Sequence, residues 1–264
     1  MDLTTVIGLV FGIAALIGGY MWDGGHISAL IVPSAMLIVF GGTFGAVAMS
    51  FPISRLKELP QAVIMAFKEP VHNPQTIIEE IVEMATVARR EGVLALEQRA
   101  QEHTNPFLKE GLMMVVDGTD PDLTRQILEL EMDALAHQHE GFAKIFESAG
   151  GIAPTMGIIG TVMGLIHVLG NLSNPDELGP AIAVAFTATL YGVASANVAY
   201  LPLSAKIKIR SKEKISEMEL MLEGILALQA GENPQLIKKK LTSFLHKKEE
   251  KNKPEAGEES GEEK

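Results

Sequence analysis

The chain has 264 residues, of which 47% are hydrophobic, and a formal net charge of −11. This length is enough to bury a core or to cross a membrane several times. Cysteine is absent, which excludes disulfide bonds and thiolate metal sites.

The apolar residues cluster in four runs without Lys, Arg, Asp or Glu: residues 3–20, 27–50, 151–171 and 180–203. Each run approaches or exceeds the roughly 20 residues that a helix needs to cross a bilayer. A soluble α-protein with buried helices is the alternative, but four charge-free runs are difficult to bury in a water-soluble core. The first run lacks the basic start of a secretory signal, so we interpret it as a retained span.

The basic residues predict the orientation of these spans. Nine of the Lys and Arg residues lie in residues 51–147 and thirteen in residues 204–264, whereas the connectors 21–26 and 172–179 have none. By the positive-inside rule, the two basic segments are cytoplasmic. Both termini are then expected in the cytoplasm.

The predicted fold class is an all-α polytopic membrane protein with four transmembrane helices and a large helical cytoplasmic domain. The first two spans fall within residues 1–50 and the last two within residues 151–203. The cytoplasmic domain consists of residues 51–150 and the C-terminal helices 204–248. The charged tail, residues 249–264, has too little apolar surface to bury and is predicted to be disordered.

Prolines and apolar spacing divide the cytoplasmic segments into helices. Phe51-Pro52 is predicted to end the second span, and Asn105-Pro106 and Asp120-Pro121 to begin further helices. No clear linker separates residues 121–150 from the third span, so we expect one continuous helix there. Helical spacing predicts further helices over residues 75–101, 203–229 and 234–246.

Catalytic chemistry is scarce in the sequence. No nucleophile–base pair, metal-ligand set or phosphate-binding fingerprint stands out. His137 and His139 are two residues apart and point to different helix faces, so we interpret them as surface residues. We therefore expect no enzymatic activity, no metal site and no cofactor.

Small and polar residues mark the third and fourth spans. Pro154, Gly157, Thr161 and Gly164 share a helix face, and Gly160 with Gly164 fits small-xxx-small packing. A similar stripe in the fourth span consists of Ala181, Ala185, Ala188, Gly192, Ser195 and Ala199, with Thr189 at its edge. Tight helix packing alone explains most of these residues. The functional alternative is a polar pathway, in which the hydroxyls of Thr161 and Thr189 offer oxygen to a passing cation.

Acidic residues are absent from all four predicted spans. A proton or cation relay through lipid usually needs an ionisable group at depth. If the protein moves ions, another chain or the small polar faces of an oligomer must complete the path.

Ordered motifs then reveal a family resemblance. They are Ala88-Arg-Arg-Glu-Gly-Val-Leu-Ala-Leu-Glu97, Ala153-Pro-Thr-Met-Gly-Ile-Ile-Gly-Thr-Val-Met-Gly164, Leu178-Gly-Pro-Ala-Ile-Ala183, Thr187-Ala-Thr-Leu-Tyr-Gly192 and Leu201-Pro-Leu203. With these motifs and the span pattern, residues 1 to about 246 resemble the MotA family of flagellar-motor stator subunits, which includes MotP and PomA.

The resemblance implies a ring of five copies around two copies of a MotB-like chain. That partner is a single-span, peptidoglycan-binding subunit whose membrane helix supplies the ion-binding aspartate. Flow of Na⁺ or H⁺ turns the ring, and the cytoplasmic domain pushes the rotor protein FliG. The location implied is the bacterial cytoplasmic (inner) membrane, and no nucleic-acid partner is expected.

Residue roles follow from the same resemblance. Thr189 matches the threonine that faces the partner aspartate, and Thr161 joins it in the ion pathway. Pro154 and Pro202 match prolines suited to conformational coupling. Arg89 or Arg90, together with Glu97, matches the charged residues that contact FliG, and we favour Arg89 and Glu97. Four glycines are interpreted as helix-packing positions: Gly157, Gly160, Gly164 and Gly192.

The coupling ion and the wider function have alternatives. Na⁺ is favoured over H⁺, because Thr161 stands where sodium-type stators resemble this chain and where several proton-type sequences carry alanine. The nearest alternative function is an ExbB- or TolQ-like proton-channel subunit that energises outer-membrane processes. That family usually has three spans, and the extra N-terminal span and the Arg-Arg-Glu-Gly motif of this chain favour the MotA family. A solute transporter, which needs inverted repeats, and a purely structural membrane scaffold are more distant alternatives.

Overall fold

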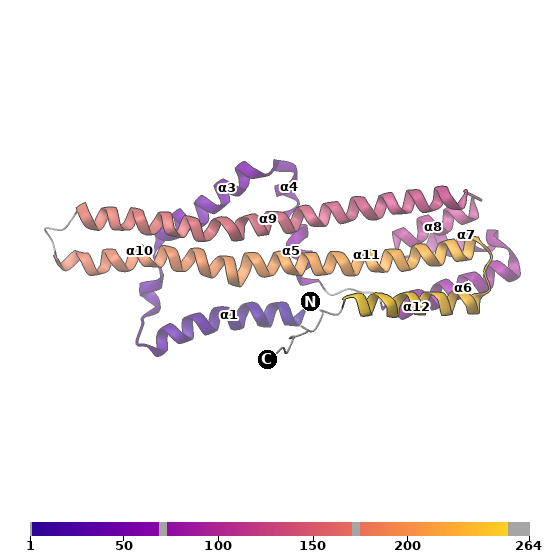
Figure 1. Cartoon of the computed structure of the whole chain (residues 1–264), viewed down its shortest axis with the longest axis horizontal. Coiled ribbons are helices and arrows are strands. Elements are labelled where there is room, and N and C mark those ends of the chain that lie inside the picture. The colour runs from indigo at the N-terminus through magenta and orange to yellow at the C-terminus, as the bar shows by residue number, and fades with distance from the viewer. Residues whose placement is uncertain (1, 69–72, 171–174, 253–264) are drawn as a thin grey trace, which may run out of the picture. The chain divides into compact units, whose positions relative to one another are not determined.

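Helices account for all regular structure in the computed structural model, which describes residues 2–68, 73–170 and 175–252 and contains no strand among them (Figure 1). Side chains are described for these residues except 175–177 and 246–252. The chain divides into two compact units. Unit 1 comprises residues 1–69 and 136–212, and unit 2 comprises residues 70–135 and 213–264.

Unit 1 contains the predicted spans. Its elements are α1 (Leu3–Trp22), η1 (Ile27–Leu30), α2 (Pro33–Met36), η2 (Leu37–Gly41), α3 (Gly42–Ser50), α4 (Ile53–Lys57), α5 (Leu59–Phe67), the second part of α9 (Pro121–Gly170), α10 (Pro175–Ser195), η4 (Ala196–Tyr200) and the first part of α11 (Leu201–Gln229). Four helical stretches are long and apolar enough to cross a membrane, and they match the four predicted runs in chain order, the third as far as Gly170, the last described residue there. The four-span prediction is thus confirmed.

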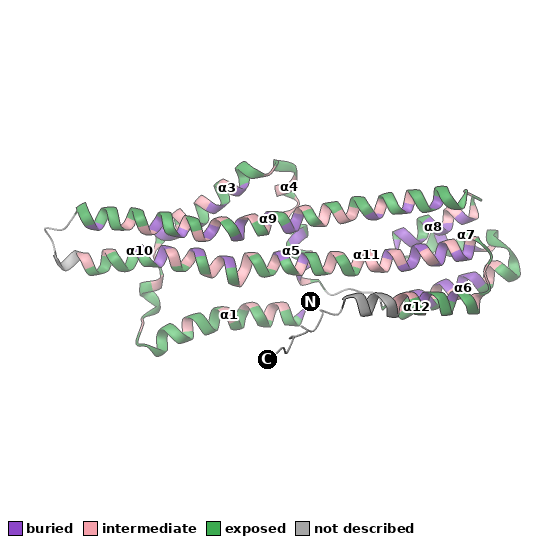
Figure 2. Ribbon diagram, viewed as in Figure 1, coloured by how far each residue is buried: buried purple, intermediate pink, exposed green. Residues whose placement is uncertain are grey.

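The outer surface of unit 1 is apolar. No residue of α1 is buried, and large side chains such as Val10 and Phe11 are exposed along it. Figure 2 shows exposed residues in green over most of α1 and α3. Apolar surface of this extent needs lipid or another chain to cover it.

The second span is less regular than the single helix that its composition predicts. Pro33 begins α2, Ile31 and Val32 are extended, and η2 is a wide π-helical turn. The Tyr191 hydroxyl accepts a hydrogen bond from the Val32 N–H at 3.1 Å and donates one to the Leu30 carbonyl. Because an unpaired backbone group is costly in lipid, Tyr191 makes this irregular segment tolerable there.

The long helices follow the prediction closely. α9 runs from Pro121 to Gly170 without a break, through Pro154. Its start is capped by Asp120, whose Oδ1 accepts from the N–H groups of Asp122 and Leu123 at 3.0 and 3.3 Å. Phe51 is extended and ends α3, as the residue before a proline should.

Unit 2 contains the remaining helices: α6 (Pro74–Glu91), η3 (Val93–Leu96), α7 (Glu97–Glu102), α8 (Pro106–Val116), the first part of α9, the second part of α11, and α12 (Pro234–Asn252). Large aliphatic side chains fill its core, among them Ile81, Leu96, Leu108, Leu112, Leu128, Met221, Ile225, Ile237 and Leu241. Asn105 caps α8 by accepting from the Phe107 N–H at 3.1 Å, and α8 begins at the predicted proline.

Two predicted helix boundaries differ from the structure. The helix expected over residues 75–101 ends at Glu91, because Gly92 adopts φ +88°, a left-handed conformation that interrupts the helix. The last helix, expected over residues 234–246, continues to Asn252. It therefore enters the tail that composition predicts to be disordered, and residues 253–264 lie outside the described residues.

Candidate functional site

Glycines bring α9 and α10 close together in unit 1, where the two helices run side by side (Figure 1). A Cβ atom at Gly157 would lie 2.9 Å from the Ala188 carbonyl oxygen and 3.0 Å from the Thr189 Cα. A Cβ at Gly192 would lie 3.1 Å from the Pro154 Cα. Both glycines thus face backbone atoms of the opposite helix, and no larger residue fits at this separation.

Two more glycines extend the contact along α9. A Cβ at Gly160 would lie 2.7 Å from the Ala188 Cβ, and a Cβ at Gly164 would lie 2.7 Å from the Ala185 Cβ. The structure therefore places all four predicted packing glycines at one helix–helix contact. Close backbone approach is the packing mode expected in lipid, where apolar side chains gain little by leaving the bilayer.

Thr161 and Thr189 meet across this contact. Their Oγ1 atoms are 2.5 Å apart, and the Thr161 hydroxyl also lies 2.9 Å from the Ala185 carbonyl oxygen and 3.1 Å from that of Gly157. Both side chains are half-buried. The sequence predicted only that each threonine lies near the middle of its span, and the structure adds that the two hydroxyls touch.

The hydrogen-bond arrangement of this pair follows from its donors. Each hydroxyl has one hydrogen and two lone pairs. The Thr189 hydroxyl also lies 3.5 Å from the Gly157 carbonyl oxygen, which is farther than the Thr161 oxygen. If Thr161 donates to the Ala185 carbonyl, its nearer carbonyl acceptor, the short contact requires Thr189 to donate to Thr161. The lone pairs of the Thr189 oxygen then accept from no described residue. The pair therefore offers hydroxyl oxygen to a cation or to a protonated carboxyl group.

The two predicted coupling prolines lie in different helices, Pro154 in the interior of α9 and Pro202 in the first turn of α11. Pro154 is inside α9, beside Gly192 at the α10 contact. Pro202 is the second residue of α11, which directly follows η4, a π-helical turn. A proline removes one backbone N–H, and a π turn is a frequent local distortion at functional sites. The junction of η4 and α11 is thus an irregular point in the fourth span.

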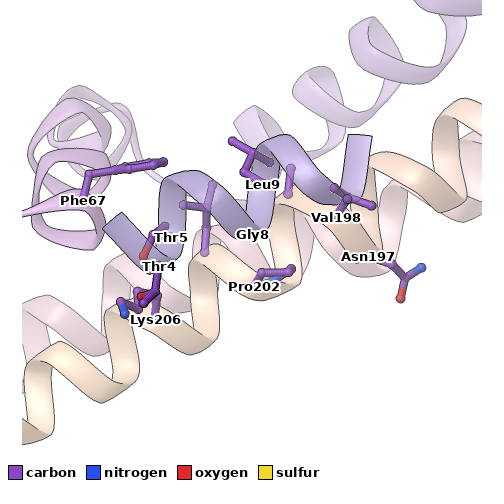
Figure 3. Close-up of a pocket in the computed structure, with 12 residues that line it drawn as sticks. Thr4, Thr5, Gly8, Leu9, Phe67, Asn197, Val198, Pro202 and Lys206 are labelled. Atoms are coloured by element: carbon purple, nitrogen blue, oxygen red, sulfur yellow. The ribbon is translucent and has the colours of Figure 1, made fainter. Parts of the chain in front are cut away.

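A cavity of about 470 Å³ lies beside that junction, between α1 and the η4–α11 segment. Figure 3 shows Pro202 and Lys206 of α11 facing Thr4, Thr5 and Gly8 of α1 across it. Its walls are mainly apolar. The cavity leaves room between the first span and the fourth.

A cluster of ion pairs lies at the N-terminal end of α1. The carboxylate of buried Asp2 accepts from the Thr4 hydroxyl at 2.6 Å and from Arg210 Nη2 at 2.6 Å, and it forms an ion pair with Lys206. The hydrogen bond from Lys206, followed by that from Thr4, holds the pKa of the Asp2 carboxyl well below its ordinary range. The Asp2 N–H also donates to the Phe67 carbonyl at 2.8 Å. Asp2 thus connects α1, α5 and α11.

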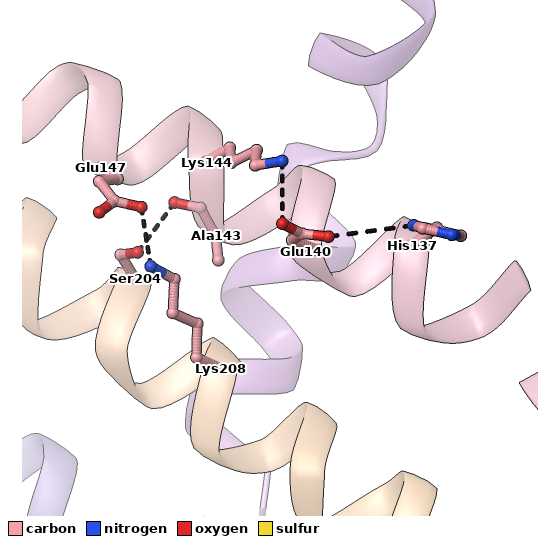
Figure 4. A network of polar contacts seen from close by, with 7 residues as sticks. All are labelled: His137, Glu140, Ala143, Lys144, Glu147, Ser204 and Lys208. Carbon is pink, nitrogen blue, oxygen red and sulfur yellow. Dashed lines mark hydrogen bonds and ion pairs between the residues drawn. The ribbon is translucent and has the colours of Figure 1, made fainter. Parts of the chain in front are cut away.

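Polar contacts also join α9 and α11 within unit 1 (Figure 4). Lys208 Nζ lies 2.8 Å from a Glu147 carboxylate oxygen, and the Ser204 hydroxyl donates to the Ala143 carbonyl at 2.9 Å. On the same side of α9, Lys144 donates to Glu140 at 2.9 Å and lowers its pKa. The Lys208–Glu147 and Ser204–Ala143 contacts join the antiparallel helices α9 and α11 beyond the apolar spans.

The predicted rotor-contact residues surround the turn at Gly92 in unit 2. Arg89 and Arg90 lie in the last turn of α6, and Glu97 begins α7. All three are exposed, and none of them forms an ion pair with another described residue. The structure therefore presents charges of both signs to solvent on the two helices that flank η3.

Family comparisons give this architecture an identity. The Motility protein A N-terminal model matches residues 6–92, and the model of the MotA/TolQ/ExbB proton channel family matches residues 99–220. Motility protein A of Bacillus subtilis (strain 168) is 40% identical over 262 residues, which cover 98% of this chain and 96% of that relative. The chain belongs to the MotA family.

Other relatives and solved structures resemble this MotA-family chain over nearly its full length. Chemotaxis protein PomA of Vibrio alginolyticus is 36% identical over 246 residues, covering 93% of this chain and 96% of the relative. The flagellar MotAB stator complex from Bacillus subtilis matches with a TM-score of 0.88 and 39% identity, covering 96% of this chain and 100% of the matched one. The C. jejuni MotAB structure matches with a TM-score of 0.88 and 32% identity, covering 92% and 96%.

These matches confirm the resemblance inferred from the motifs. They also confirm that the chain is a channel-type subunit rather than an enzyme. The N-terminal match over residues 6–92 is to Motility protein A, so the ExbB- or TolQ-like alternative is not retained.

Several structurally important residues were not singled out from sequence. Tyr191 supports the irregular second span, and Asp2, Lys206 and Arg210 tie α1 to α11. A tyrosine inside an apolar span signals a hydroxyl that needs a partner. Asp2 precedes the first apolar run, which is a signal for an N-cap. Neither signal predicts which distant residue Tyr191 or Asp2 contacts.

Proposed function

We propose that this MotA-family chain is a torque-generating stator subunit of the bacterial flagellar motor. With a MotB-like, single-span, peptidoglycan-binding partner it forms a cation channel in the bacterial inner membrane. Cation flow through the channel drives torque on the rotor protein FliG. Five copies of the chain surround two copies of the partner, and both termini and the unit 2 helices lie in the cytoplasm.

The Thr161–Thr189 hydroxyl pair carries this proposal. It lies in a helix contact made of glycine and alanine, within spans that have no carboxylate. A cation at that depth needs both oxygen ligands and a compensating charge. The pair supplies oxygen, so the charge must come from a partner chain. The solved relatives are MotAB complexes, and they support a MotB-like source for this charge.

Sodium is the proposed coupling ion in preference to the proton. Na⁺ is a hard cation that binds oxygen ligands. Two hydroxyls 2.5 Å apart, with lone pairs available on Thr189, suit a partly dehydrated cation beside a partner carboxylate. A proton needs only the carboxylate and water.

Two further groups of residues are proposed to couple ion flow in the channel to movement of the rotor. Pro154 and Pro202 are proposed to let α9 and the fourth span change shape as the partner carboxylate binds and releases its ion. Arg89, Arg90 and Glu97 are proposed to contact FliG, because they are exposed and form no ion pair with other described residues. Arg89 and Glu97 are the favoured pair.

The test is complementation of a flagellated strain that lacks its own stators. This chain and a MotB-like partner are co-expressed, and the rotation of tethered cells is measured while K⁺ replaces Na⁺ at constant pH. The proposal predicts that rotation is restored and that its speed rises with external Na⁺. Thr161→Ala is expected to weaken the dependence on Na⁺.

Two contrary outcomes are distinguishable. Assembled but motionless flagella, despite a chain–partner complex in the membrane, would contradict the stator function itself. Rotation that follows the proton gradient and ignores Na⁺ would contradict only the choice of ion, and Thr161→Ala would then have little effect on ion preference.

A further inference from the structure

The turn at Gly92 exposes an apolar side chain in the middle of a charged surface. η3 follows Gly92, and its side chains differ in how far they are exposed. Leu96 is fully buried in the unit 2 core, whereas Leu94 is 71% exposed and Val93 is 39% exposed. Leu96 thus anchors this short turn in the core, whereas Leu94 projects into solvent.

The turn is held in this shape by local contacts. The Gly92 N–H donates to the Ala88 carbonyl at 2.9 Å, and the Ala95 N–H donates to the Gly92 carbonyl at 3.2 Å. Further along, Arg99 of α7 lies 2.6 Å from a Glu83 carboxylate oxygen of α6. These bonds fix both sides of the turn. The backbone at Leu94 is therefore held in its conformation, and the turn loses little conformational entropy when a partner binds there.

The surroundings of Leu94 resemble the composition of a protein interface. Arg90, Glu91 and Glu97 are exposed on the flanking helices. An apolar centre inside a charged rim is the usual anatomy of a binding surface. The rim carries both signs, so a complementary partner presents an acidic side chain to the arginines, a basic one to Glu97, and an apolar recess between them.

We propose that Leu94, with Val93 at its edge, is the apolar centre of the contact with the rotor protein. This inference rests on the proposed stator function, which supplies a rotor surface as the partner. The leucine side chain inserts into an apolar recess of the rotor surface and provides most of the short-range affinity. The charges of Arg89, Arg90 and Glu97 orient the two surfaces and speed their encounter.

The structure offers a matched control. Leu130 of α9 is also in unit 2 and is 68% exposed, but it lies within a long helix and not in the Gly92 turn. Truncating either leucine removes the same atoms from a similarly exposed position. A difference between Leu94→Ala and Leu130→Ala therefore reports on the location of the leucine and not on the loss of an apolar side chain as such.

The experiment measures binding of the purified stator complex, in lipid nanodiscs, to purified FliG at low and high salt. Leu94→Ala is expected to weaken binding roughly tenfold at both salt concentrations, because the loss of apolar burial is not screened. Arg89→Gln is expected to weaken binding mainly at low salt. Leu94→Met should retain most of the affinity, and Leu130→Ala should match the wild type.

Three outcomes contradict the inference. If Leu94→Ala binds like Leu130→Ala while Arg89→Gln and Glu97→Gln reduce binding, the rotor face stands but Leu94 is not its centre. If Leu94→Ala changes the size of the purified complex, a second copy of the chain covers this leucine instead. If the wild-type complex does not bind FliG and the charge variants rotate tethered cells normally, the proposed rotor contact itself fails.

Discussion

The contact between α9 and α10 and the core of unit 2 are built from opposite kinds of residue. In unit 2, the largest fully buried side chains are leucine, isoleucine and methionine. At the α9–α10 contact, glycine and alanine let the two backbones touch, and the polar atoms present are hydroxyls. Large apolar side chains of the same helices, such as Ile158 and Phe186, are exposed.

The difference reflects the medium around each region, which is water for unit 2 and lipid for the α9–α10 contact. Burial of aliphatic surface from water stabilises a core by about 25 cal/mol per Å², so unit 2 gains from large side chains. In lipid that gain is absent, and helices associate through close packing and hydrogen bonds. The small-residue contact is thus the membrane counterpart of the unit 2 core, and four substitutions test that comparison.

The largest effect is expected from a cavity in unit 2. Leu128 is fully buried, so Leu128→Ala should lower the free energy of unfolding by about 2–5 kcal/mol. Leu130→Ala, two residues away and exposed, should change it by less than about 0.5 kcal/mol. Thermal unfolding of the purified complex measures both. Equal melting temperatures for the two variants would contradict an aliphatic core there.

Adding one methyl group should damage the α9–α10 contact. In Gly157→Ala the new Cβ would lie 2.9 Å from a backbone oxygen, and overpacking of this kind costs about 1–3 kcal/mol. Gly151→Ala, on the same helix, has no atom within 4 Å of the new methyl group. We expect the first variant to lose motility and the second to keep it. Equal motility would mean that the two helices do not approach this closely.

Breaking the anchor of α1 should have a smaller effect. Asp2→Asn removes the charge that pairs with Lys206 and Arg210, so the melting temperature should fall at pH 7, whereas Asp23→Asn at the exposed end of α1 should leave it unchanged. Because the folded-state pKa of Asp2 is depressed, its stabilisation is fully present above about pH 4 and is lost as the pH falls further. A difference between wild type and Asp2→Asn that varied between pH 6 and 8 would contradict this.

The smallest effect is expected at Glu131 in unit 2. Burial, followed by repulsion from Glu110, raises the pKa of the Glu131 carboxyl. Its ionised form therefore destabilises the folded state at neutral pH, and stability rises as the pH falls toward the raised pKa. Glu131→Gln should raise the melting temperature slightly at pH 8 and less at pH 5. The Glu129 carboxylate pairs with Arg125 at 3.6 Å, so Glu129→Gln should not raise the melting temperature.

The helices were the part of the fold that sequence predicted best. Charge-free runs located the four spans, and Asp120-Pro121 located the start of α9, because membrane thickness and proline chemistry act locally. Local rules failed where one residue changes the backbone. Gly92 ends α6 inside a run of good helix formers, and Pro33 divides the second span.

The candidate site was predictable in its residues but not in its contacts. Spacing placed Gly157, Thr161 and Gly164 on one face of a helix. It did not show that Thr161 touches Thr189, since that depends on how far α10 slides along α9. Similarly, the sequence does not show that Leu94 is exposed and Leu96 buried, because the short η3 turn has no helical or strand periodicity.

The central claim is that the Thr161–Thr189 pair forms part of the ion path, and flagellar rotation tests it most directly. Thr161→Val and Thr189→Val preserve the side-chain shape and remove the hydroxyls. Thr155→Val is the control, since its exposed hydroxyl donates only to the Ile152 carbonyl, at 2.7 Å. With equal amounts of assembled complex, rotation of tethered cells should stop or slow at least severalfold in the first two variants and persist in the third. Normal rotation of the Thr161→Val, Thr189→Val double variant would contradict the claim.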